Sequence, residues 1–274
     1  MLFRSLACAS VVAGLVGALT GLGGGVILVP VLTLVFGVNL RYAVGASLIS
    51  VIATSSGAAS SYVKDGFANV RIGILMEVAT TLGAIGGATL ASRVSTGTIA
   101  IVFGVVLLYA TVQSARPEPR VAPSPTPDPL GEKLRLSGIE PTPQGPVPYS
   151  AHHVPAGLSL MAVAGAVSGL LGIGSGALKV LAMDRVMRLP FKVSTTTSNF
   201  MIGVTAAASA GIYLRNGYVD PVLACPVMLG VLLGALVGAR VLVSARVKVL
   251  RVVFAGVLGL TAVEMIVQGV RGAL

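Results

Sequence analysis

The chain has 274 residues, of which 55% are hydrophobic and only 10% are charged, and its mean hydropathy is +0.94. Soluble domains carry about 25% charged residues, so this composition excludes a water-exposed globular protein and predicts an integral membrane protein. The formal net charge of +10 comes from basic residues spread between apolar segments rather than gathered in one patch, which argues against nucleic-acid binding.

Apolar segments recur along the chain in two sets of five. They run over about 5–20, 24–37, 42–63, 70–91 and 97–114, and again over about 156–171, 175–188, 193–214, 221–242 and 248–268. A helix needs about 20 apolar residues to cross the hydrocarbon, and the last three segments of each set approach that length. The first two are shorter, and the sequence leaves open whether they span or re-enter. We therefore expect an all-α membrane protein with about 8–10 transmembrane helices.

The two sets are copies of one another at a fixed offset. The polar and aromatic matches include Ser47 with Ser198, Thr54 with Thr205, Tyr62 with Tyr213 and Phe103 with Phe254. Such matches mark an internal duplication, with a first membrane repeat over 1–114 and a second over 156–274. The first segment has the composition of a signal peptide, but its counterpart lies mid-chain, so we expect it to remain in the mature fold.

The segment between the repeats, residues 115–155, is rich in proline, and its acidic and basic residues balance. We expect it to be a polyproline-like, poorly packed linker.

Basic residues concentrate in the connections on one side of the membrane, which the positive-inside rule makes cytoplasmic. Equivalent connections of the two repeats differ in charge: the one at Arg41 is nearly bare, whereas its partner holds Arg185, Arg188 and Lys192. Equivalent loops on opposite faces would differ in this way. We therefore expect two inverted-topology repeats in a bacterial or archaeal plasma (inner) membrane, with the linker cytoplasmic and both termini outside.

A glycine run interrupts each repeat at the same point, over residues 21–25 and 172–176. Unwound backbone in a membrane persists only where it is buried in protein or lines a cavity. A helix that begins there directs free N–H groups and a positive dipole end at an anion. Inverted repeats with interrupted helices are typical of secondary transporters, whose site lies between the repeats. Tight helix packing through glycine is the alternative interpretation.

Polar residues next to these breaks complete the predicted anion site. The expected substrate-binding residues are Gly23, Gly24, Gly25, Ser47, Gly174, Ser175, Gly176, Lys179, Ser198 and Asn199. Lys179 is an intramembrane charge and by default a functional residue; snorkelling towards the cytoplasmic side is its alternative. We interpret Thr54, Thr205 and Ser209 as packing residues.

Two carboxylates lie inside apolar segments, Glu77 in the fourth segment and Glu264 in the last. Either side chain can take up and release a proton during transport, so both are candidates for proton coupling. Pairing with a nearby basic group, or a position near the interface, is the alternative for each.

Both repeats carry motifs of a known family. The glycine runs, the stretch Gly45-Ala46-Ser47-Leu48 and the stretch Thr197-Ser198-Asn199-Phe200-Met201 resemble those of the TauE/SafE membrane proteins. The resemblance covers everything except the linker. It implies a transporter of small sulfur-containing anions such as sulfite, sulfoacetate or related organosulfonates, commonly outward. Two departures are Ser175 at the place of Gly24, and the length of the linker.

We therefore expect an alternating-access exporter of a small anion, with a passive anion channel and a non-transporting scaffold subunit as alternatives. The spans show no Ser/His/Asp set, carboxylate pair or His/Cys cluster, so we expect no enzyme activity, no metal site and no cofactor. The expected partners are the small anion and the lipid bilayer, without nucleic acid. The sequence leaves a homo-oligomer open.

Overall fold

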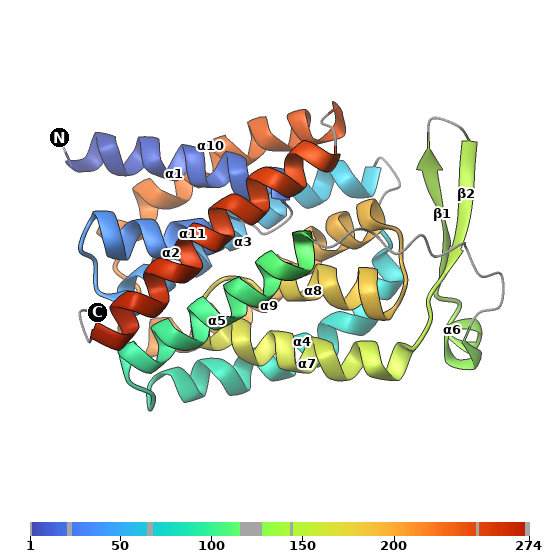
Figure 1. Ribbon diagram of the computed structural model, residues 1–274, viewed down its shortest axis with the longest axis horizontal. Helices are drawn as coiled ribbons and strands as arrows, with labels where there is room; N and C mark the ends of the chain where they lie inside the picture. Colours follow the sequence, from blue (N-terminus) through green and yellow to red (C-terminus); the bar gives the residue numbers. More distant parts are fainter. Residues whose placement is uncertain are drawn as a thin grey trace.

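The computed structural model describes residues 2–20, 24–64, 68–115, 128–142, 145–244 and 247–271, and this part of the chain is mostly helical (Figure 1). The elements, in order, are α1 (Leu2–Thr20), α2 (Gly25–Pro30), η1 (Val31–Val35), α3 (Leu40–Lys64), α4 (Val70–Ala91), α5 (Thr96–Ala115), α6 (Pro129–Lys133), β1 (Ser137–Thr142), β2 (Gly145–Ser150), α7 (Val154–Leu171), α8 (Gly176–Leu181), η2 (Ala182–Val186), α9 (Phe191–Arg215), α10 (Pro221–Ser244) and α11 (Val247–Arg271). The segments η1 and η2 are short π-helices.

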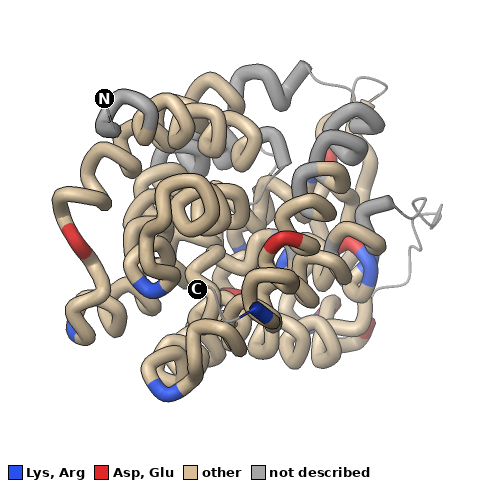
Figure 2. Tube along the Cα trace, turned by 60° about the vertical axis from the view of Figure 1, so that its left-hand side comes forward, with Lys and Arg blue, Asp and Glu red and all other residues tan. Residues whose placement is uncertain are grey.

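Three helices in the described part are long and apolar enough to cross a membrane, over Val70–Ala91, Val154–Leu171 and Pro221–Gly238. Shorter apolar helices cover Leu6–Ala18, Gly25–Val35 and Thr96–Tyr109. Figure 2 shows the charged residues as isolated bands on long uncharged stretches of chain. The expectation of a mostly helical chain with apolar helices of membrane length is therefore confirmed, for three helices among the described residues.

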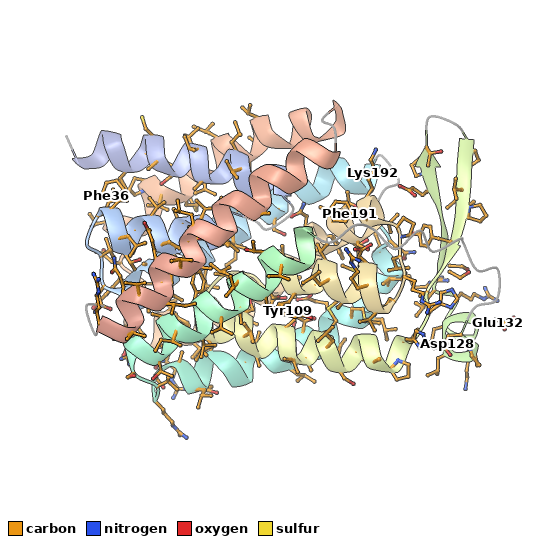
Figure 3. The ribbon with its side chains drawn as sticks, viewed as in Figure 1. Phe36, Tyr109, Asp128, Glu132, Phe191 and Lys192 are labelled. Atoms are coloured by element: carbon orange, nitrogen blue, oxygen red, sulfur yellow. The ribbon has the colours of Figure 1, made fainter. Side chains whose placement is uncertain are left out.

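The bundle has two distinct ends. At one, the terminal end, α1 begins and α11 ends; at the other, the hairpin end, lie α6 and the two strands (Figure 1). Helix α1 starts at the terminal end and α7 starts at the hairpin end, so they run in opposite directions. Phe36, just before α3, and Phe191, the first residue of α9, also lie at opposite ends (Figure 3).

Each long helix of the first half packs on a helix of the second half. Helix α1 packs on α10 and α4 packs on α7, while α5 packs on α11 and α3 on α9. A Cβ atom on Gly14 would lie 2.1 Å from the carbonyl oxygen of Val231, and one on Gly165 would lie 1.9 Å from that of Thr80. Only glycine permits such close backbones. Each of the α1–α10 and α4–α7 contacts thus joins one helix from each half.

Helices α7 and α8, with η2, form a helical hairpin whose tip is the second glycine run. The backbone N–H of His152, just before α7, donates to the carbonyl of Met187, just after η2, at 3.0 Å. The chain therefore returns to the end from which α7 started. With six and five residues, α8 and η2 rise only about 16 Å, roughly half the hydrocarbon thickness. In the first half, α2 and η1 have the same two lengths.

Part of the linker is folded, contrary to the expectation of a poorly packed polyproline segment. Strands β1 and β2 pair antiparallel, from Ser137 with Ser150 to Thr142 with Gly145. Leu136 is buried in a core that also contains Ile72 of α4. Prolines are tolerated because an isolated two-stranded ribbon has no inner strand whose N–H groups must all pair. Residues 116–127 lie outside the described part.

Candidate functional site

The tip of the second helical hairpin is an unwound turn. Gly172, Gly174 and Ser175 have φ angles of 67°, 71° and 54°, in the left-handed region that side-chain-bearing residues rarely adopt. The N–H of Gly172 caps α7 by donating to the carbonyl of Ser168 at 2.7 Å. Ser175 is a non-glycine residue in this conformation, which costs about 1 kcal/mol. The predicted helix break is thus present in the second half.

The two glycine runs meet through α3. The Ser47 hydroxyl donates to the carbonyl of Gly172 at 3.0 Å. A Cβ atom on Gly25, the first residue of α2, would lie 2.7 Å from Ser47 Oγ and 3.4 Å from the Gly172 oxygen. The start of α2, the first third of α3 and the tip of the second hairpin therefore share one contact. Gly24 caps α2 with a φ of 75°, and the predicted Gly23 lies outside the described residues.

Helix α9 contacts the tip of the second helical hairpin through Ser198 and Ile202. The Ser198 hydroxyl donates to the carbonyl of Gly176 at 3.3 Å. A Cβ atom on Gly174 would lie 2.7 Å from Ile202 Cγ2, so the tip fits against α9 only because residue 174 is glycine. The predicted residues Gly25, Ser47, Gly174–Gly176 and Ser198 are thus brought together.

Two predicted polar groups, one on the tip and one on α9, are buried without a hydrogen-bond partner. Ser175 Oγ and Asn199 Nδ2 have no partner within the described part of the chain, although the two residues are only 1% and 5% exposed. Buried polar groups are normally paired, and an unmade hydrogen bond costs about 1–3 kcal/mol. Both groups can donate, so an electron-rich ligand would satisfy them.

A buried ion pair lies on the helix that leaves the tip. Lys179 of α8 is fully buried, and its Nζ lies 3.0 Å from Oε2 of Glu77 on α4. Snorkelling is therefore not how this lysine is accommodated. The Thr205 hydroxyl on α9 accepts from Lys179 Nζ at 2.5 Å and donates to Glu77 Oε1 at 2.5 Å. Thr81 donates to the same carboxylate oxygen at 3.2 Å.

Thr205 has a larger part than the packing role predicted for it. Its hydroxyl contacts both charges, so the cluster joins α4, α8 and α9. Its spacing in the sequence could have indicated a functional role, because Thr205 follows Ser198 by two helical turns and lies on the same helix face. Thr81, one turn after Glu77, carried a weaker signal of the same kind.

The apolar core beside the ion pair is rich in methionine. Five methionines belong to it: Met76, Met161, Met183, Met187 and Met201. Met76 precedes Glu77 in α4, and the carbonyl of Met201 lies 3.4 Å from the Thr205 hydroxyl. Methionine side chains are unbranched and adapt to changes in shape.

The second carboxylate candidate lies elsewhere. Glu264 is on α11, which packs on α5, and its side chain is exposed on the surface of the bundle. In the described part, the structure therefore joins Lys179 to Glu77 and leaves Glu264 outside that cluster.

The ion pair takes one residue from each half, and the two residues related to it by the duplication are apolar. Leu28 stands at the place of Lys179 and Met228 at the place of Glu77, while Thr54 corresponds to Thr205. The Thr54 hydroxyl donates to the carbonyl of Val51 in its own helix at 3.1 Å. The charged cluster is consequently absent from this equivalent position.

Comparison with known proteins places the chain in a family. Residues 6–265 match the family model described as sulfite exporter TauE/SafE. The probable membrane transporter protein YunE of Bacillus subtilis is 26% identical over 282 residues, covering 98% of this chain and 99% of the relative. The probable membrane transporter protein YdhB of the same organism is 27% identical over 229 residues, covering 83% and 85%. No solved structure matches. The chain therefore belongs to the TauE/SafE family of membrane transporters.

Proposed function

We propose that the protein is a secondary transporter that exports small sulfur-containing anions, namely sulfite, sulfoacetate or a related organosulfonate, by alternating access. The family description supports the substrate class, since it names sulfite export. The observation that carries the proposal is the presence of two buried donors without partners among the described residues: Ser175 Oγ in the second glycine run, and Asn199 Nδ2 on α9, next to the Ser198 that bonds this run. The three acceptor oxygens of a sulfonate or sulfite suit such donors.

Each predicted residue has a role in this proposal. Ser175 and Asn199 donate to the anion, while Ser47 and Ser198 hold the unwound tip by bonding its carbonyls. The glycines bring backbone N–H groups close to the ligand. Lys179 supplies positive charge. The complete proposed set is Gly23, Gly24, Gly25, Ser47, Gly174, Ser175, Gly176, Lys179, Ser198 and Asn199.

The proposal includes two inverted repeats, over 1–114 and 156–274, joined by a cytoplasmic linker. Two observations support it. Helices α1 and α7 run in opposite directions (Figure 1), and the contact of α1 with α10 has its counterpart in the contact of α7 with α4. The hairpin end would then face the cytoplasm, because Arg71 and Lys192, at the starts of α4 and α9, lie there. Both termini would face outward across the inner membrane.

Reconstituted protein tests the transport function. Purified protein in liposomes would be loaded with unlabelled sulfite or sulfoacetate, and the entry of labelled anion would be followed against protein-free liposomes. An exporter that works by alternating access exchanges internal for external anion, so internal substrate accelerates uptake of the label. Flux without this acceleration would instead indicate a channel. Absence of flux for sulfite, sulfoacetate, thiosulfate, sulfate and chloride would leave a non-transporting scaffold and overturn the proposal.

A further inference from the structure

We propose that Lys179 exchanges its anionic partner during transport: Glu77 in the empty protein, the substrate anion in the loaded protein, with Glu77 taking up one proton as it is released. The inference rests on the proposed transport function and specifies how that function is coupled. In the empty state the ammonium contacts Glu77 Oε2 at 3.0 Å with no exposed surface.

Charge balance at the buried cluster sets the coupling. Lys179⁺ with Glu77⁻ is neutral, as is Lys179⁺ with a monovalent anion and a protonated Glu77. Binding the anion alone leaves a net charge of −1, and protonating Glu77 alone leaves +1. An unbalanced buried charge costs several kcal/mol. Only the two neutral states can therefore reorient across the membrane, and one proton moves with each monovalent anion in the same direction. Net export under this coupling requires that the product of the anion and proton concentrations be higher inside than outside.

The groups facing the pair fit this exchange. Among the described residues, the side chains that bond Glu77 are Lys179, Thr205 and Thr81, and those that bond Lys179 are Glu77 and Thr205. A hydroxyl has one donor and two acceptor positions. Thr205 can thus donate to the carboxylate in the empty state and accept from the carboxylic acid in the loaded one.

The position of Lys179 connects the pair to the anion site. Its backbone N–H donates to the carbonyl of Ser175 at 2.9 Å, so Lys179 follows the residue with the unpaired hydroxyl by one helical turn. The neighbouring methionine core can adjust as the partner changes. The equivalent Leu28 and Met228 carry no charge, which gives one proton per cycle rather than two.

Flux measurements on the unmodified protein test the inference directly. Isethionate is a suitable probe because it is the monovalent anion of a strong sulfonic acid, so almost none of it exists in a neutral form that could cross lipid without the protein. We expect an outside-acid pH gradient to drive its accumulation in liposomes when the membrane potential is clamped at zero. A potassium diffusion potential without a pH gradient should drive none. Accumulation that follows the potential and ignores the pH gradient would overturn the inference.

The variant Glu77→Gln separates coupling from transport. Its amide oxygen can still accept from Lys179, but the empty site now carries a net charge of +1 and cannot return empty. Isethionate exchange should persist, whereas pH-driven accumulation should fall at least about tenfold. Glu264→Gln, the same chemical change on α11, should leave the coupling intact. Accumulation by Glu77→Gln equal to that of the unmodified protein would exclude Glu77 as the proton site.

The two proposals fail in different ways. If the unmodified protein exchanges no anion at all, the proposed transport function is wrong. If it exchanges isethionate but the pH gradient drives no accumulation, only the coupling inference is wrong. The measurement on the unmodified protein decides this even if Glu77→Gln does not reach the membrane.

Discussion

The short helical segments that follow the two glycine runs share their lengths and differ in chemistry. Each consists of a six-residue α-helix and a five-residue π-helix at equivalent positions. The helix of the second half carries Lys179, bonded to Glu77 of α4, whereas the helix of the first half carries Leu28 at that place, and the counterpart of Glu77 on α10 is Met228. The backbone break can therefore be repeated without the charges. The residues that build the short helices are thus distinct from the charged pair proposed to couple proton and anion.

The largest effect is expected from making the second half resemble the first at one residue. Lys179→Leu removes the ammonium and leaves Glu77 buried without its countercharge, which should cost about 3–5 kcal/mol of folding free energy. We expect much less protein in the membrane and no measurable transport by the protein that remains. Quantitative immunoblotting of membranes and liposome flux measure the two effects.

The paired change Lys179→Leu with Glu77→Met completes the resemblance and serves as the control. Replacing both partners removes the unpaired charge, so membrane levels should recover towards those of the unmodified protein. Transport should stay absent. Transport by the double variant would show that the ion pair only stabilises the fold.

The tip itself should be the next most sensitive feature. Gly174→Leu places a side chain at a φ of 71° and against Ile202 on α9, so the tip cannot keep its position. We expect transport to be abolished while a substantial fraction of the protein still reaches the membrane. Gly211→Leu is the matched control, because a Cβ atom there has open space. Equal transport by the two variants would reduce the glycine run to a packing feature.

A smaller and more selective effect is expected at Ser175, whose equivalent is Gly24. Ser175→Gly removes the unpartnered hydroxyl and also removes left-handed strain, so stability should rise by about 1 kcal/mol. Loss of one hydrogen bond to a charged ligand should weaken anion binding about 10- to 100-fold. Thermal unfolding with and without anion measures both quantities. Unchanged affinity would exclude Ser175 as a donor to the substrate.

The smallest effect is expected at the β1–β2 hairpin, which is bonded to Asn69, just before α4. The Asn69 side chain donates to the Tyr149 hydroxyl at 3.0 Å, and the Asn69 N–H donates to Thr197 Oγ1 at 3.0 Å. Their repeat counterparts are Asp220 and Ala46. Tyr149→Phe should cost about 1 kcal/mol, measured as a lower unfolding temperature.

The same contact predicts a pH dependence. Burial raises the pKa of the Tyr149 phenol above its ordinary value of 10.0, an effect that the hydrogen bond from Asn69 partly opposes. The folded state therefore favours the neutral phenol, so its contribution is fully present below pH 10 and is lost as the pH rises above it. The gap in unfolding temperature between the unmodified protein and Tyr149→Phe should narrow above pH 10. A constant gap would contradict this account.

The helices and their breaks could be predicted from the sequence, whereas the side-chain contacts between distant residues could not. The helix breaks at the glycine runs follow from local chemistry. The fixed offset is visible in the sequence itself, and α2, η1 and α3 have the same lengths as α8, η2 and α9. The Glu77–Lys179 pair was not predicted as a pair because the two residues are 102 positions apart. Their repeat counterparts are apolar, so the duplication carried no signal for them.

The folded part of the linker was missed for a different reason. Proline-rich composition favours an extended, solvated chain, and the local sequence contains no strong strand signal. The strands are fixed instead by tertiary contacts, notably the burial of Leu136 and the bond between Asn69 and Tyr149. Such contacts cannot be read from composition.

The glycine-to-carbonyl contacts between the halves also constrain how the protein is made. Helices α1 and α4 use glycine residues to pack closely on α10 and α7, which the ribosome synthesises later. The glycine-bearing faces of α1 and α4 are therefore exposed to lipid until the second half is inserted. Each fragment made alone should be degraded by membrane proteases, and synthesis of both fragments in one cell should rescue them.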